Sequence, residues 1–309
     1  MRRVCFLINE VESLKPANCL LLANALVARG DKVYLSFLDS LALHVDRIVS
    51  RVFRVEQPLE PGFSLLNCVF EFANLADFDY VWVLGLGNRI SFLDKIQLLW
   101  SLQSHTRIIN SVETLLFLHS KYYTCLLPHV FPAPETYASS DLEFLWEVYK
   151  KSGDTWIVKP PARSLGRDVF ILRQGDTNAR VILQNMTGYG ADEFCIMQRY
   201  VPEIALGEKR VLMAGGHIIG QYKRTANDDH RTNIHQGASP SICDLDPQEI
   251  ALCERIGKHL LGIGTLFVGI DLVYPYVLEI NVLSPGGMTT IMDLTGVNLA
   301  ARVVGQIVV

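Results

Sequence analysis

The order of elements in the first 37 residues constrains the fold more than any other feature of the chain. Val4–Ile8 is an apolar run typical of a buried strand, and Cys19–Arg29 has helical apolar spacing. That spacing stops at Gly30, which suits the left-handed conformation at a helix end, and Lys32–Phe37 resumes as a strand. Strands joined through a helix pair in parallel, so a sheet with helices packed against it is expected.

The same alternation continues to about residue 110. Tyr80–Leu84 and Arg107–Asn110 have the composition of further strands, and Phe92–Gln103 between them has the spacing of a helix. We therefore predict that residues 1–120 form a doubly wound α/β module.

The pattern changes after Pro128, Pro132 and Pro134, which break regular structure. A helix is expected at Leu142–Lys150, and the following segments favour an α+β region rather than alternating α/β units. We divide this region into a central module at 121–197 and a C-terminal module at 198–309. The expected strands are Trp156–Lys159, Val169–Leu172, Phe194–Arg199, Arg210–Met213, His217–Lys223, Phe267–Val273 and Val277–Val282.

Composition and charge exclude several classes of protein. No stretch reaches the roughly 20 apolar residues that span a bilayer, and Asn9 and Glu10 cut short the first apolar run, so no signal peptide is expected. The 7 cysteines form no C-x-x-C pair, which argues against a zinc ribbon or a disulfide framework. The net charge is −4, with no basic run for nucleic acid. We expect a cytoplasmic protein with a small-molecule partner.

The segment from Phe267 to Asn281 indicates a β-hairpin that carries a metal site. If Pro275 is the centre of the turn, Asp271 lies opposite Glu279, and Glu279 and Asn281 share one face of their strand. Three oxygen ligands then converge, which suits a hard cation such as Mg²⁺. The alternative is a solvated hairpin face with ordinary charges, but two opposed acids without a cation would repel each other.

Two lysines are candidates for phosphate binding. Lys121 follows the Asn110–Ser111 segment, and Lys159 ends the strand Trp156–Lys159, where a point charge can hold a phosphate. Each could equally be a surface lysine. The loop after Lys159 contains Ser164 and Gly166, and backbone N–H groups in such a turn can cradle phosphates, although one glycine is a weak signal.

Two further segments carry polar groups at informative positions. Gln198, Arg199, Tyr200 and Val201 lead from a strand into an extended stretch before Pro202, whose backbone could pair with an adenine edge or be only a strand and a turn. Arg224 precedes a long polar segment, Thr225–Ser239, that contains Arg231 and Asn233 and could act as a lid. A metal site at Asp229, His230 and His235 is a weaker alternative, because these residues have no supporting helix or cysteine partner.

Taken in order, these residues resemble the ATP-grasp superfamily of carboxylate–amine ligases, and most closely the prokaryotic type of glutathione synthetase. The resemblance implies three modules, with ATP held between two sheets and a lid at Thr225–Ser239. Its implied roles are phosphate contact for Lys121 and Lys159, adenine contact for Gln198–Val201, and ribose contact for Glu208. It further implies two Mg²⁺ ions, for which Mn²⁺ is a possible substitute, on Asp271, Glu279 and Asn281. Catalytic roles fall on Arg210, Arg224, Arg231 and Asn233, and substrate contacts on Ser284, Gly286 and Gly287.

Three departures from the family pattern bear on specificity and turnover. The phosphate loop keeps only Gly166, Ser284 is followed by Pro-Gly-Gly, and Leu86–Arg89 stands where the family has a basic and acidic stretch. The expected reaction is glutathione synthesis from γ-glutamylcysteine and glycine. The alternatives are ligation of another peptide or amino acid, such as glutamate, and a silent ATP-binding regulatory protein. A homo-oligomer is possible.

Overall fold

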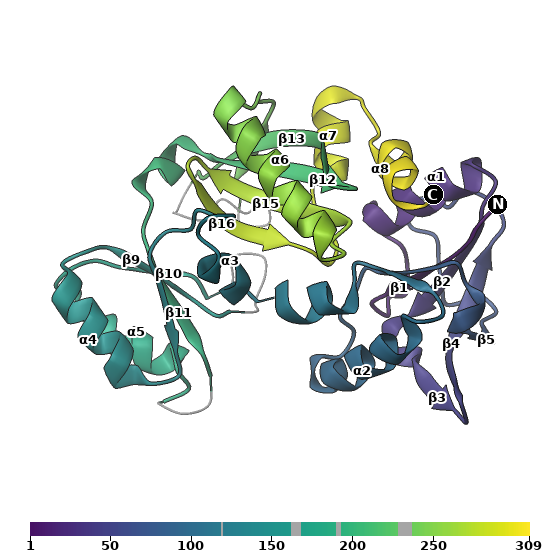
Figure 1. Cartoon of the computed structure of the whole chain (residues 1–309), viewed down its shortest axis with the longest axis horizontal. Helices are drawn as coiled ribbons and strands as arrows, with labels where there is room; N and C mark the ends of the chain where they lie inside the picture. The colour runs from purple at the N-terminus through teal and green to yellow at the C-terminus, as the bar shows by residue number, and fades with distance from the viewer. Residues whose placement is uncertain (119, 162–167, 190–192, 228–236) are drawn as a thin grey trace.

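The computed structural model describes residues 1–118, 120–161, 168–189, 193–227 and 237–309. Within these residues the strands form three sheets, which follow one another along the long axis of the molecule (Figure 1). No helix in the described ranges is long and apolar enough to cross a membrane.

The first sheet confirms the predicted doubly wound module. Its parallel core has the order β2-β1-β6-β7. Side chains of β1 alternate between two cores: Phe6 packs with α1, whereas Leu7 packs on the opposite face with α2. Burial on both faces explains why the strand is a continuous apolar run. The bounds are β1 Arg3–Ile8, α1 Asn18–Ala28, β2 Lys32–Phe37, β6 Tyr80–Val83, α2 Phe92–Leu102 and β7 Arg107–Ile109.

Three strands that the sequence interpretation did not include extend this sheet beyond β2. They are β3 (Ala42–His44), β4 (Arg47–Val55) and β5 (Glu71–Asn74), and all their pairings are antiparallel. The short helical turns of this module are η1 (Leu38–Ser40), η2 (Leu75–Asp77) and η3 (Arg89–Ser91).

The second sheet forms a smaller lobe with the order β10-β9-β11-β8. Helices α4 and α5 cover one face, where Leu145, Trp156 and Leu183 are fully buried. Asp141 caps the start of α4, and Gly153 ends it in the left-handed conformation. The bounds are β8 Thr136–Ser139, α4 Leu142–Ser152, β9 Trp156–Lys159, β10 Phe170–Leu172, α5 Ala179–Met186 and β11 Cys195–Arg199.

The third sheet has the order β14-β13-β12-β15-β16, and its two faces differ in character. One face is apolar and packs under α6, whose start has a capping box between Asp246 and Glu249. The other face carries the polar residues of the candidate site. The bounds are η5 Pro202–Leu206, β12 Glu208–Ala214, β13 His217–Thr225, β14 Ser239–Ser241, α6 Pro247–Gly262, β15 Phe267–Val273 and β16 Tyr276–Asn281.

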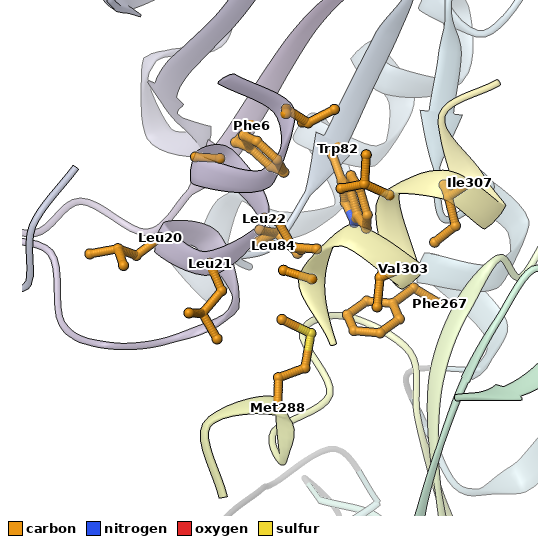
Figure 2. Packing of buried hydrophobic residues seen from close by; sticks show 14 of the residues in the cluster. Phe6, Leu20, Leu21, Leu22, Trp82, Leu84, Phe267, Met288, Val303 and Ile307 are labelled. Carbon is orange, nitrogen blue, oxygen red and sulfur yellow. The ribbon is translucent and has the colours of Figure 1, made fainter. Parts of the chain in front are cut away.

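The C-terminal helices connect the third sheet to the first module. Helix α8 (Ala300–Ile307) lies against α1, and one continuous core includes Phe6, Trp82, Phe267 and Val303 (Figure 2). Helix α7 (Met288–Thr295) adds Met288 to the same core. The connection between the first and second lobes contains η4 (Thr114–Leu118) and α3 (Tyr122–Leu126). The proposed domain boundaries remain predictions, and the one at 197/198 falls within β11.

Candidate active site

The β15–β16 hairpin has the predicted register, but for a different reason. Asp271 lies opposite Glu279, as expected. The turn is centred between Tyr274 and Pro275, because Val273 pairs with Tyr276; a bulge between Asp271 and Leu272 then moves the pairing by one residue. Directly opposed residues share a face of a sheet, so Asp271 and Glu279 point to the same side.

Cross-strand pairing surrounds Asp271 with arginines. Arg210 lies opposite Asp271 on β12, and its Nε and Nη2 atoms donate to the two carboxylate oxygens at 2.5 and 3.0 Å. Arg224 of β13 lies 2.8 Å from Asp271 Oδ1 and also pairs with Glu208, its cross-strand neighbour. All four residues are buried, each at most 6 % exposed. The sheet therefore holds a closed network of two arginines and two acids.

The electrostatics of this network favour the charged forms of Asp271 and Arg224. Burial opposes ionisation of Asp271, but Arg210 and Arg224 outweigh burial and lower its pKa. Burial likewise opposes the charge of Arg224, yet Asp271 and Glu208 raise its pKa. The Nε of Arg224 is buried and has no hydrogen-bond partner in the described part of the chain. A buried cationic donor of this kind favours an anionic ligand.

The oxygen atoms beside this network suit a hard cation. The Asn281 amide nitrogen donates to Asp271 Oδ2 at 3.3 Å, so the Asn281 carbonyl oxygen belongs to the same group of polar atoms, and Glu279 is on the same face of the hairpin. Carboxylate and amide oxygens are the ligands that Mg²⁺ prefers, completed by water and phosphate. The described residues contain no group of three His, Cys, Asp or Glu side chains that could hold a metal ion. A cation here would therefore depend on Asn281 and on phosphate oxygens as well as on the two acids.

Lys121 and Lys159 come from the second lobe and its connection, and both face the hairpin. Lys121 precedes α3, and its Nζ lies 3.3 Å from Glu279 Oε1 and 3.4 Å from the Pro161 carbonyl oxygen. Lys159 ends β9 and donates to Gln198 Oε1 at 2.8 Å. Burial and the neighbouring charge of Lys121 lower the pKa of Lys159 to about 8, against a smaller opposing effect of Glu279. The two predicted lysines thus lie near one another and near the hairpin.

The predicted adenine segment is only partly available for a ligand. The Gln198 side chain points inward, bridging Lys159 and Thr136. Arg199 points away from them and forms ion pairs with Glu135 and Asp154 on the surface. The backbone N–H groups of Arg199 and Tyr200 already donate to Glu135 and Thr155 carbonyls. An adenine edge would have to use carbonyl groups or the N–H of the buried Val201.

The Ser284–Gly287 loop lies beside the arginine network. Arg210 Nη1 donates to the Gly286 carbonyl at 2.9 Å. Gly287 has φ +135°, and a Cβ there would lie 2.9 Å from the Tyr222 ring. The sequence interpretation assigned no role to Asn18, which donates from the first module to Ser284 Oγ and to the Pro285 carbonyl. A contact between residues 266 positions apart leaves no local sequence signal.

A second residue whose role the sequence did not reveal is Asn110. Its side-chain oxygen accepts from the N–H groups of Leu266 and Phe267 at 2.7 and 2.8 Å, and its amide donates to the carbonyls of Phe267 and Val282. Asn110 therefore fixes the end of the first module against both strands of the hairpin. Four predicted site residues, Ser164, Gly166, Arg231 and Asn233, and with them most of the predicted lid, lie outside the described residues.

Similarity to solved structures shows that the chain has the ATP-grasp fold. The D-cycloserine synthetase DcsG matches with a TM-score of 0.67 at 15% identity, over 98% of each chain. A RimK domain protein ATP-grasp from Sphaerobacter thermophilus matches with a TM-score of 0.66 at 19% identity, over 99% of this chain and 100% of the other.

Sequence similarity specifies the family within this fold. The family described as "Prokaryotic glutathione synthetase, ATP-grasp domain" matches residues 120–296, and the chain belongs to this family. Glutathione synthetases of Nostoc sp. and Brucella melitensis are each 32% identical, over 65% and 69% of this chain. These matches span 61% and 67% of the relatives' own lengths. The Gloeobacter violaceus enzyme is 27% identical over 99% of this chain and 96% of its own.

Proposed function

We propose that the protein is an ATP- and Mg²⁺-dependent, ADP-forming ligase that joins the carboxylate of γ-glutamylcysteine to the amine of glycine. The observation that carries the proposal is the buried network of Arg210, Arg224, Asp271 and Glu208 on the sheet face that Lys121 also reaches through Glu279. The similarity to glutathione synthetases supports these substrates.

The reaction requires a carboxylate to become an acyl-phosphate before the amine attacks, because a carboxylate is a poor electrophile. Lys121 and Lys159 hold the phosphate groups of ATP as point charges. Arg210 and Arg224 neutralise the negative charge that develops on the transferred phosphoryl group and on the carbonyl oxygen of the tetrahedral intermediate. The Nε of Arg224, which has no hydrogen-bond partner among the described residues, is a preformed donor for such an oxygen.

Asp271, Glu279 and Asn281 would hold magnesium in this site, and two ions are expected from the family. The ion would supply positive charge to offset that of the phosphate groups. Mn²⁺ also accepts oxygen ligands and is the natural replacement to test. The ion pairs of Asp271 with Arg210 and Arg224 support a single cluster of proposed metal ligands and anion-binding side chains.

The deciding experiment measures ADP and peptide product in the same reaction, over pairs of acids and amines that include γ-glutamylcysteine with glycine, and glutamate. The expected result is equal ADP and product only with γ-glutamylcysteine and glycine, and only with Mg²⁺ or Mn²⁺. Product from a different pair would assign another substrate. ATP binding without ADP release for any pair would refute the ligase assignment and favour a silent ATP-binding protein.

A further inference from the structure

Asn18 links the first module to the candidate catalytic loop through contacts that helix formation does not explain. It opens α1 and is 5 % exposed, yet its Nδ2 donates away from the helix, to Ser284 Oγ at 3.2 Å and to the Pro285 carbonyl at 2.9 Å. The amide of a buried asparagine is costly to desolvate unless it is hydrogen-bonded. The position therefore favours a residue that holds the 284–287 loop.

The same loop touches the arginine network on its other side. Arg210 donates to the Gly286 carbonyl at 2.9 Å while two of its other nitrogens hold Asp271. A Cβ built on Gly269 would lie 2.9 Å from Pro285 and 3.2 Å from Arg210, so the loop and the arginine pack tightly over the floor of the sheet. A displacement of Pro285 or Gly286 is therefore transmitted directly to the guanidinium of Arg210.

Buried and exposed residues alternate along the 284–287 loop, which is the pattern expected if one side of the loop is held by the protein and the other can contact a substrate. Pro285 and Gly287 are buried, whereas Ser284 and Gly286 are exposed. Pro285 accepts from Asn18 of the first module and Gly287 lies against Tyr222, whereas the carbonyl of the exposed Gly286 accepts from Arg210. Ser284 is exposed, although its Oγ accepts from Asn18. Asn18 thus holds the loop at Ser284 and Pro285 and leaves Gly286, next to Arg210, accessible.

We propose that Asn18 is a positioning residue: from the first module it fixes the Ser284–Gly287 loop, and through that loop the orientation of Arg210 toward the acid substrate. This inference rests on the proposed ligase function. It explains why the first module forms a buried polar contact with the Ser284–Gly287 loop. Asn18 acts through its contacts with Ser284 and Pro285.

Asn24 provides a matched control on the same helix. Its amide donates to the Leu59 carbonyl at 2.8 Å and accepts from the Leu59 N–H at 2.7 Å, so it holds a loop within the first module. Asn18→Ala and Asn24→Ala each remove two side-chain hydrogen bonds from α1. Only the first variant releases the 284–287 loop.

The experiment compares the two variants in full-length protein by steady-state kinetics and by hydrogen–deuterium exchange. For Asn18→Ala we expect a roughly 10- to 100-fold lower kcat/KM for the acid substrate, as for a misplaced catalytic group, with unchanged affinity for a non-hydrolysable ATP analogue. Exchange of peptides covering residues 284–287 should become faster. Asn24→Ala should leave both properties at wild-type values.

A second variant covers the case in which Asn18→Ala fails to fold. Asn18→Leu keeps the approximate size of the side chain but removes the Nδ2 donor without adding a buried charge, and the same kinetic and exchange changes are expected. Equal loop exchange in wild type and the Asn18 variants, or equal kinetic losses in the Asn18 and Asn24 variants, would overturn the positioning role. A wild-type protein that releases no ADP would instead overturn the proposed function, and exchange would still report on the loop.

Discussion

The two acids that face each other on the β15–β16 hairpin should respond differently to loss of charge. Asp271 is 4 % exposed and balances two buried arginines, Arg210 and Arg224. Glu279 has a side chain 31% exposed and pairs with Lys121 at 3.3 Å. Asp271→Asn removes charge from a closed network, whereas Glu279→Gln removes it from a partly solvated pair.

The expected magnitudes follow from this difference in burial. Removing one partner of a buried ion pair costs about 3–5 kcal/mol, because the remaining charges stay uncompensated. A solvent-screened pair contributes about 0–1 kcal/mol. Asp271→Asn should therefore lower the melting temperature strongly, and Glu279→Gln should leave it nearly unchanged. Both should lower Mg²⁺-dependent ligation by at least about 10²-fold, since each removes a proposed oxygen ligand of a cation that supplies several kcal/mol.

The assay is ADP release and product formation across a magnesium titration, with calorimetric unfolding of the same samples. Glu147→Gln on α4 is the control, because it also removes an acid paired with lysines, Lys150 and Lys151, but at the surface of the second lobe. It should change neither property. Undiminished turnover in Glu279→Gln would refute the metal assignment, and wild-type stability in Asp271→Asn would refute the energetic reading of the arginine network.

Three other perturbations test further contacts of the site. Affinity for a non-hydrolysable ATP analogue should fall as pH rises through about 8, the lowered pKa of Lys159. The ammonium group of Lys159 is charged below that pH and neutral above it. Calorimetric titration at several pH values should show this fall in wild type and not in Lys159→Ala. Lys121→Ala should weaken the same binding, and unchanged affinity in both lysine variants would place ATP elsewhere. Asn110→Ala leaves buried backbone groups of the hairpin unpaired, each costing about 1–3 kcal/mol, and should therefore lower the melting temperature. An unchanged melting temperature would contradict the anchoring role.

The sequence predicted those elements whose signals are local. Continuous apolar strands such as Val4–Ile8 and the glycine after α1 need no tertiary information, and the structure confirms both elements. Two missed elements also carried signals: β4 alternates buried and exposed residues, and α6 begins with a capping box at Asp246 and Glu249. Both elements can therefore be predicted from local sequence signals alone.

The candidate site shows where local signals end. The residue types on the hairpin indicated a hard-cation site, and the Asp271–Glu279 pairing was confirmed, but the bulge that produces it could not be predicted from turn position alone. The partners of Asp271 come from β12 and β13, about 50 to 60 residues earlier, and their identity depends on strand order. Asn18 and Asn110 required the packing of whole modules.

The distribution of polar residues over the third sheet explains how stability and chemistry coexist there. Alternate residues of β12 belong to different faces: Val211 and Met213 are buried under α6, while Glu208 and Arg210 point into the site. The apolar face stabilises the sheet through burial, about 25 cal/mol per Å² of apolar surface. The polar face can then hold four buried charges, which alone would oppose folding through desolvation. Because strand pairing fixes Arg210 opposite Asp271 and Glu208 opposite Arg224, the geometry of the charged cluster is set by the same register that aligns the apolar face under α6.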